Sequence, residues 1–149
     1  MPETKRRKKT SPRSRARQRA LQALYQWLMT HGDMQAILRQ FREEQNFSNT
    51  DTELFTQLAL KASDEAPLLI EQLAPHMHLN WDQVEPTEKA TLLIGACELA
   101  FFPAVPAAVV INEAVQLSHT FGSQDAHTFI NAVLDKLARE LRPQEMRRP

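Results

Sequence analysis

The sequence predicts an all-α protein with about seven helices packed as two small bundles. Apolar residues return at intervals of three and four along the chain, and no stretch alternates with the period of two that is typical of a strand. Proline, glycine, aspartate and serine stand between these stretches, at positions where they begin or end helices. At 149 residues the chain is long enough to fold without disulfides, most simply as one domain.

The first helix is expected over residues 12–30. Ser11 is a good N-cap residue, and Pro12 suits the first helical position, whose N–H has no partner within the helix. Gly32 is expected to end this helix, since glycine is common just beyond a helix C-terminus.

The apolar face of this first helix also carries Arg13 and Arg17. Burying an unpaired arginine would cost several kcal/mol. We therefore expect the helix to dock on the body only from about Ala20 onward, with its first turns projecting beyond the body. Four arginines would then surround the free end of the helix, where they could meet phosphates: Arg13, Arg15, Arg17 and Arg19.

Three shorter helices are expected next. Asp33 would cap the second helix, and Thr50 or Asp51 would cap the third. Pro67 is tolerated in a first helical turn but not in a helix interior. The helical pattern should therefore break near residue 63 and resume as a short fourth helix.

The last three helices are marked by prolines and a glycine. Pro86 would open the fifth helix, which is apolar on more than one side and therefore central, and which should end before Pro103. Pro106 would lie in the first turn of the sixth helix, and Gly122 would end it. Asp125 is expected to cap the seventh helix.

The net charge of zero conceals a basic segment attached to an acidic body. Residues 1–19 hold nine Lys and Arg against one acid, whereas residues 20–138 hold five basic and fifteen acidic residues. Such a division suggests a polyanion as partner of the basic segment, although the two parts could also neutralise each other. We expect a disordered basic extension over residues 1–10, one helical domain over 11–142 and a frayed tail over 143–149.

The sequence gives little sign of catalytic or metal chemistry. Cys97 lies in an apolar run and is expected to be a core residue in a reducing compartment. His76 and His78 have no nearby residues to complete a metal shell. Three glycines are too few for a phosphate-cradling loop at the required spacing. We therefore expect a soluble, cytosolic protein that is not an enzyme and uses neither a metal nor a cofactor.

Three segments resemble the bacterial NusB family of transcription antitermination proteins. They are RSRARQRALQALYQW at 13–27, VEPTEKATLLIGACEL at 84–99 and VPAAVVINEAVQLSHTFGSQDAHTFINAVLDKLA at 105–138. The most specific piece lies at 111–135, where many identities fall at fixed spacing. The resemblance covers nearly all of residues 13–142.

This resemblance implies an all-helical RNA-binding protein of the bacterial cytoplasm. Proteins of the family bind the single-stranded boxA element of nascent ribosomal RNA leaders together with the ribosomal protein NusE. The complex joins RNA polymerase and other Nus factors and suppresses premature termination, and it catalyses no reaction.

The resemblance also implies roles for single residues. The arginine-rich motif of the family is matched by Arg13, Arg15, Arg17 and Arg19, and Tyr25 would lie beside it. Asp125 and Phe129 would lie near bound RNA, although Phe129 also fits the inward face of its helix. Glu88 would belong to an acidic surface for the basic ribosomal partner, although an acid in a first helical turn is favoured by the helix dipole alone.

Some features depart from the family pattern. The KRRKK stretch at 5–9 is longer than expected, and Gln18 stands where the family often has an acid. Phe101 and Phe102 replace positions that are usually polar, and would form an exposed apolar patch that favours a homodimer. Two alternatives remain: an RNA-binding or dimerisation module without an antitermination role, and a relative of the N-terminal domain of ribosomal RNA cytosine methyltransferases. The second lacks room for a catalytic domain in 149 residues.

Overall fold

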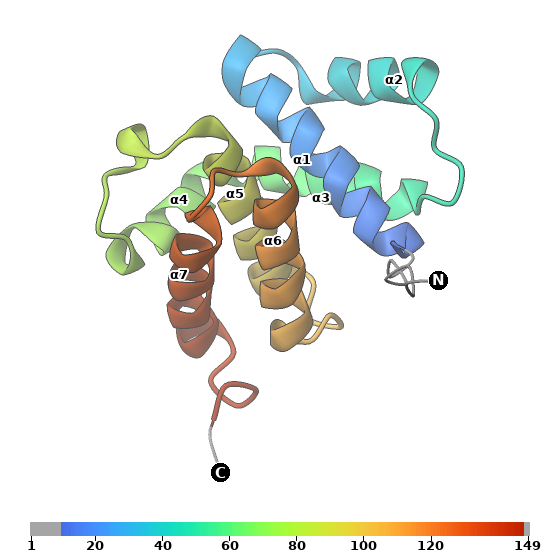
Figure 1. Ribbon diagram of the computed structural model, residues 1–149. Coiled ribbons are helices and arrows are strands. Elements are labelled where there is room, and N and C mark those ends of the chain that lie inside the picture. Colours follow the sequence, from blue (N-terminus) through green and yellow to red (C-terminus); the bar gives the residue numbers. More distant parts are fainter. Residues whose placement is uncertain (1–9, 148–149) are drawn as a thin grey trace, which may run out of the picture.

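Figure 1 shows the protein as a computed structural model, in which residues 10–147 are described. The prediction of an all-α fold is confirmed: the described residues form helices and turns and no strand. The seven α-helices are α1 (Pro12–Thr30), α2 (Met34–Glu44), α3 (Thr52–Asp64), α4 (Ala66–Leu73), α5 (Pro86–Phe101), α6 (Ala107–Phe121) and α7 (Ala126–Leu141), and two 3-10 turns, η1 (Ala74–His76) and η2 (Trp81–Gln83), lie between α4 and α5.

The helices form two groups that meet at α5. Helix α1 packs on α2 and α3, and α4, α6 and α7 form the second group (Figure 1). Helix α5 contacts α1 and α3 on one side and α4, α6 and α7 on the other. Its residues 90–99 are all buried, as expected for a helix that is apolar on more than one side.

The predicted N-caps of the first three helices are present. The side chains of Ser11, Asp33 and Asp51 each accept a hydrogen bond from a first-turn N–H of their helix. Helix α1 ends at Thr30, as predicted, but the residue that adopts the left-handed conformation at its end is His31, with φ of 54°, and not Gly32. The N–H of His31 bonds to the carbonyl of Trp27, which closes the last turn.

The core positions of α5 leave no spare room. Cys97 is fully buried, and burial, followed by the neighbouring Glu98 carboxylate, raises the pKa of its thiol to about 12. The residue is thus an inert core side chain, as expected. Gly95 lies against α7, where a Cβ atom at this position would come within 2.5 Å of Leu134 Cδ1.

The last described residues belong to the tail over 143–149 that was expected to be frayed. Residues 143–146 form a turn in which Met146 packs against the core. Glu145 accepts a hydrogen bond of 2.8 Å from the N–H of Ala107 at the start of α6, and it also pairs with Arg142 at 2.9 Å. Of the extension over 1–10 that was expected to be disordered, residues 1–9 lie outside the described residues.

Candidate nucleic-acid interface

The arginines of α1 fall into two kinds, which the sequence pattern did not distinguish. Arg17 is buried, with only 3% of its surface exposed, and its guanidinium makes a two-pronged ion pair with Glu98 of α5. Nε lies 2.7 Å from Glu98 Oε1, and Nη2 lies 2.8 Å from Glu98 Oε2. Nη1 also reaches Glu113 of α6 at 3.2 Å, and Ser14 Oγ donates to the same Glu113 oxygen at 2.6 Å. We call these four residues the buried arginine cluster.

The predicted exposure of Arg17 is therefore wrong, and so is the predicted overhang of α1. Ala16 and Ala20 have no exposed surface, and the carbonyl of Pro12 accepts a hydrogen bond from the N–H of Asp51, so α1 is docked from its first turn. An arginine on the core face is accommodated because it is paired. Burial acts to lower the pKa of Arg17, but the Glu98 and Glu113 carboxylates outweigh burial and raise it.

The other arginines of the motif remain available to a ligand. Arg13 is exposed, and Arg15 and Arg19 are partly exposed. Arg19 makes a side-chain contact of 3.1 Å with Gln22 on its own helix. Tyr25 is 40% exposed, ten residues beyond Arg15 and therefore about 15 Å further along the helix axis.

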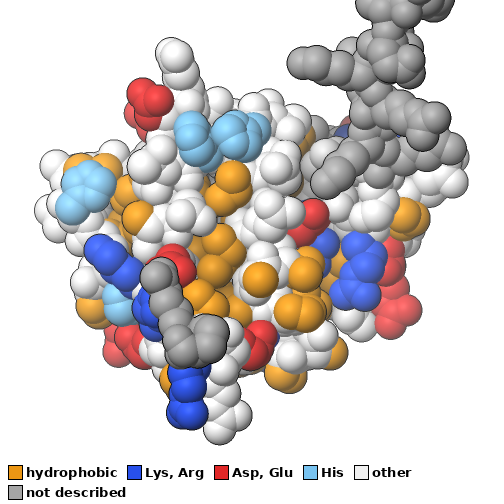
Figure 2. Space-filling model, turned by 60° about the horizontal axis from the view of Figure 1, so that its bottom comes forward, with side chains coloured by type: hydrophobic (Ala, Val, Ile, Leu, Met, Phe, Trp, Pro, Cys, Tyr) orange, Lys and Arg blue, Asp and Glu red, His pale blue; other side chains and the backbone are white. Residues whose placement is uncertain are grey.

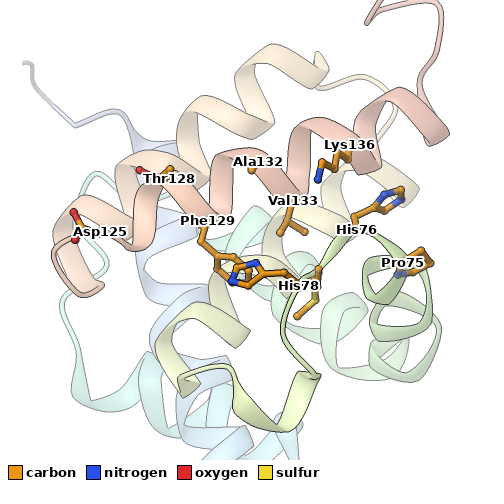
Figure 3. A pocket seen from close by; sticks show the side chains of 10 residues that line it. Pro75, His76, His78, Asp125, Thr128, Phe129, Ala132, Val133 and Lys136 are labelled. Carbon is orange, nitrogen blue, oxygen red and sulfur yellow. The ribbon is translucent and has the colours of Figure 1, made fainter.

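A hollow of about 630 Å³ lies between α7 and the chain that leaves α4. Figure 3 shows Asp125 at one end of this hollow, Lys136 towards the other, and the Phe129 ring facing into it beside His78. The two rings meet edge to face, with centroids 5.4 Å apart. We call this space the connector hollow; both Asp125 and Phe129 line it.

Two of the residues that line the connector hollow differ in detail from what the sequence suggested. Asp125 stands at the predicted N-cap position of α7, but its side chain accepts no hydrogen bond from the helix, and it is exposed. Phe129 is partly buried and packs against the core, and it also lines the hollow; its proximity to bound RNA stays a prediction. In the sequence His78 was considered only as a metal ligand with His76, and its contact with Phe129 was not predicted.

Glu88 does not lie on an exposed acidic surface, contrary to expectation. It is 7% exposed and accepts a hydrogen bond of 3.2 Å from Ser123 Oγ, in the turn between α6 and α7. Phe101 and Phe102 are partly buried and not fully exposed, and Lys61 Nζ lies 4.5 Å from the centre of the Phe101 ring.

The described surface carries no single basic patch on the face shown in Figure 2. There, the Lys and Arg side chains form separate groups on either side of an apolar centre. No helix in the described part of the chain is long and apolar enough to cross a membrane. Within residues 10–147 no three His, Cys, Asp or Glu side chains are grouped so that they could hold a metal ion.

The chain is similar to known proteins along nearly all of its length. The pattern of the NusB family matches residues 14–139. A transcription antitermination protein NusB from Sodalis glossinidius is 41% identical over 135 residues, which are 91% of this chain and 97% of the relative. The corresponding protein of Neisseria meningitidis serogroup B is 38% identical over 91% of this chain and 96% of its own length.

Solved structures share the fold. One contains the antitermination factors NusB and NusE in complex with double-stranded RNA; its matching chain has a TM-score of 0.78 and 24% identity, and the match covers 85% of this chain and 96% of that one. T. maritima NusB matches with a TM-score of 0.79 and 21% identity, over 93% of this chain and 98% of its own. Family pattern, relatives and fold agree, and the chain belongs to the NusB family.

Proposed function

We propose that this chain is a transcription antitermination factor that binds the single-stranded boxA element of ribosomal RNA leaders together with the ribosomal protein NusE, within the RNA polymerase complex that includes other Nus factors. The observation that carries the proposal is the match to antitermination proteins over 91% of the chain at about 40% identity. The proposal places the protein in the bacterial cytoplasm, where transcription takes place, and assigns it no catalysed reaction.

The arrangement of the described residues supports two kinds of contact with RNA. Arg13, Arg15 and Arg19 present positive charge along α1, which suits the phosphate backbone. Phe129 in the connector hollow and Tyr25 on α1 present aromatic rings on which splayed bases can stack. Arg17 is not part of this proposal, because its donors are engaged in the buried arginine cluster.

The exposed arginines should make the affinity for RNA depend on salt concentration in a defined way. If three arginines each neutralise one phosphate of a single strand, log K falls against log salt with a slope of about −2, and affinity drops roughly twentyfold between 50 and 200 mM salt. Arg13→Ala should flatten the slope by about 0.7. Arg39→Ala, which removes an exposed arginine on α2, is the matched control and should leave the slope unchanged.

The specific function is tested by fluorescence anisotropy with a labelled boxA RNA, with a scrambled RNA of the same composition and with a duplex, each with and without NusE. The proposal expects tighter binding of boxA, and a further gain when NusE is present. Equal affinity for boxA and scrambled RNA would favour the alternative of an RNA-binding module without an antitermination role. Phe129→Leu keeps an apolar side chain but removes the ring, and should lose about 1–3 kcal/mol of binding free energy if a base stacks there.

A further inference from the structure

A second hollow, between α1 and α6, has no role in the contacts proposed above. It has a volume of about 360 Å³ and is lined mainly by uncharged polar side chains. Ser11, the N-cap of α1, lines it together with Ser14 and Gln18 of α1. Asn112, Glu113 and Gln116 line it from α6. These six residues define what we call the amide trough.

The amides of the trough are available for binding. Within the described part of the chain, the side chains of Gln18, Asn112 and Gln116 make no hydrogen bond, whereas Ser14 and Glu113 bond to each other and Glu113 also to Arg17. Each free amide offers one acceptor and two donors. The rim of the trough therefore presents unpaired donors and acceptors, whereas Ser14 and Glu113 at its floor are already hydrogen-bonded.

The charge at the floor of the trough disfavours phosphate. The carboxylates of Glu98 and Glu113 meet only one guanidinium, that of Arg17, within the buried arginine cluster, so an excess negative charge lies beneath the trough. Neutral base edges, with their own amino and carbonyl groups, suit such a surface, since Asn and Gln side chains pair with bases through both groups of the amide.

Positive charge lies directly beside the trough. Arg13 lines an adjoining hollow that shares Ser11, Ser14 and Glu113 with it. Thr10, two residues before the start of α1, also lines the trough, and in the sequence it follows the stretch KRRKK. A strand whose phosphates meet the basic residues at the start of α1 would thus bring its bases over the amides.

We propose that the amide trough is a subsite for nucleobases of single-stranded RNA, in which Gln18 and Gln116 read base edges while Arg13 holds the adjacent phosphate. This inference rests on the proposed RNA-binding function and adds residues that determine its specificity.

The test uses the full chain and anisotropy with two labelled probes: the single-stranded boxA RNA and an abasic ribose-phosphate oligomer of the same length. The double variant Gln18→Met/Gln116→Met keeps the side-chain length but removes the amides. It should bind the base-bearing RNA about tenfold more weakly, as expected for the loss of amide contacts to bases. Its binding to the abasic oligomer should not change, whereas Arg13→Ala should weaken the binding of both probes.

Gln57→Met is the matched control, because Gln57 is an exposed amide on α3, outside the trough. It should affect neither probe. An unchanged affinity of the double variant for RNA, or an equal loss with both probes, would overturn the inference while leaving the proposed function intact. Failure of the unaltered protein to bind either probe would instead overturn the proposed function itself. A thermal unfolding curve of each variant establishes that it is folded before binding is measured.

Discussion

Replacing Arg17 with Met should destabilise the protein far more than the same change at any other arginine of the motif. The side chain is 3% exposed, and its loss would leave the Glu98 carboxylate, which is 1% exposed, without the two short bonds of 2.7 and 2.8 Å that now neutralise it. Removing one partner of a buried pair costs about 3–5 kcal/mol, much of it from the charge left behind. For a chain of this length that loss lowers Tm by roughly 10 °C or more.

Urea unfolding followed by circular dichroism measures this free energy directly. Arg13→Met is the control, because Arg13 is exposed on the same helix, and it should change the free energy of unfolding by less than about 0.5 kcal/mol. The double variant Arg17→Met/Glu98→Leu removes both charges, and should regain a large part of the loss, since an apolar pair of similar volume can replace a buried ion pair.

The reasoning would be refuted if Arg17→Met lowered the free energy of unfolding by less than about 1 kcal/mol. It would also be refuted if the loss of stability in the double variant equalled the sum of the losses in Arg17→Met and Glu98→Leu alone. The first result would show that the guanidinium is not confined between the two helices in solution. The second would show that Glu98 contributes through contacts other than Arg17.

Three further predictions follow from the packing and the charges. Glu145→Gln should lower the free energy of unfolding at neutral pH, because the hydrogen bond from the Ala107 N–H stabilises the Glu145 carboxylate and lowers its pKa. The difference in stability between the variant and the unaltered protein should vanish as pH falls from 4.5 through the native pKa of Glu145, as acid unfolding curves can measure. Cys97 should resist alkylation at pH 8 in the native protein, and rapid labelling of the native protein would contradict this. The contribution of Cys97 to the free energy of unfolding should fall as pH rises from about 9 to about 12, because only the unfolded thiol ionises in that range. Gly95→Ala should cost about 1–3 kcal/mol in urea unfolding, because the added methyl meets Leu134, despite the better helix propensity of alanine.

The parts of the fold that depend on local chemistry could be predicted from the sequence. Ser11, Asp33 and Asp51 cap their helices through groups three residues away, and a sequence window contains both partners of each bond. The central place of α5 followed from apolar residues on more than one of its sides. Such features are independent of how distant segments meet.

The candidate site depends on contacts between residues far apart in the chain, and these contacts could not be predicted from the sequence. Arg17 bonds to Glu98 and Glu113, which lie 81 and 96 positions further along the chain. Because neither partner is close in sequence, we predicted that Arg17 is exposed, whereas it is buried and paired. Glu98 offered a signal, as a lone acid in an otherwise apolar stretch of α5, but nothing local identified its partner. Glu88 was likewise assigned to the surface because the turn that covers it, at Ser123, lies 35 residues away.

Arg142 has a consequence for the order in which the molecule assembles. Its guanidinium donates to the carbonyls of Glu98, Leu99, Phe102 and Val105, which surround the corner between α5 and α6. These bonds span 37 to 44 residues, so each closes a long loop whose entropy must be lost before the bond forms. On a ribosome, α5 and α6 emerge well before Arg142 does. Backbone N–H groups of the corner also bond to the carbonyls of Glu98 and Phe102, but those of Leu99 and Val105 must wait, hydrated, for a residue that is synthesised after the whole of α7.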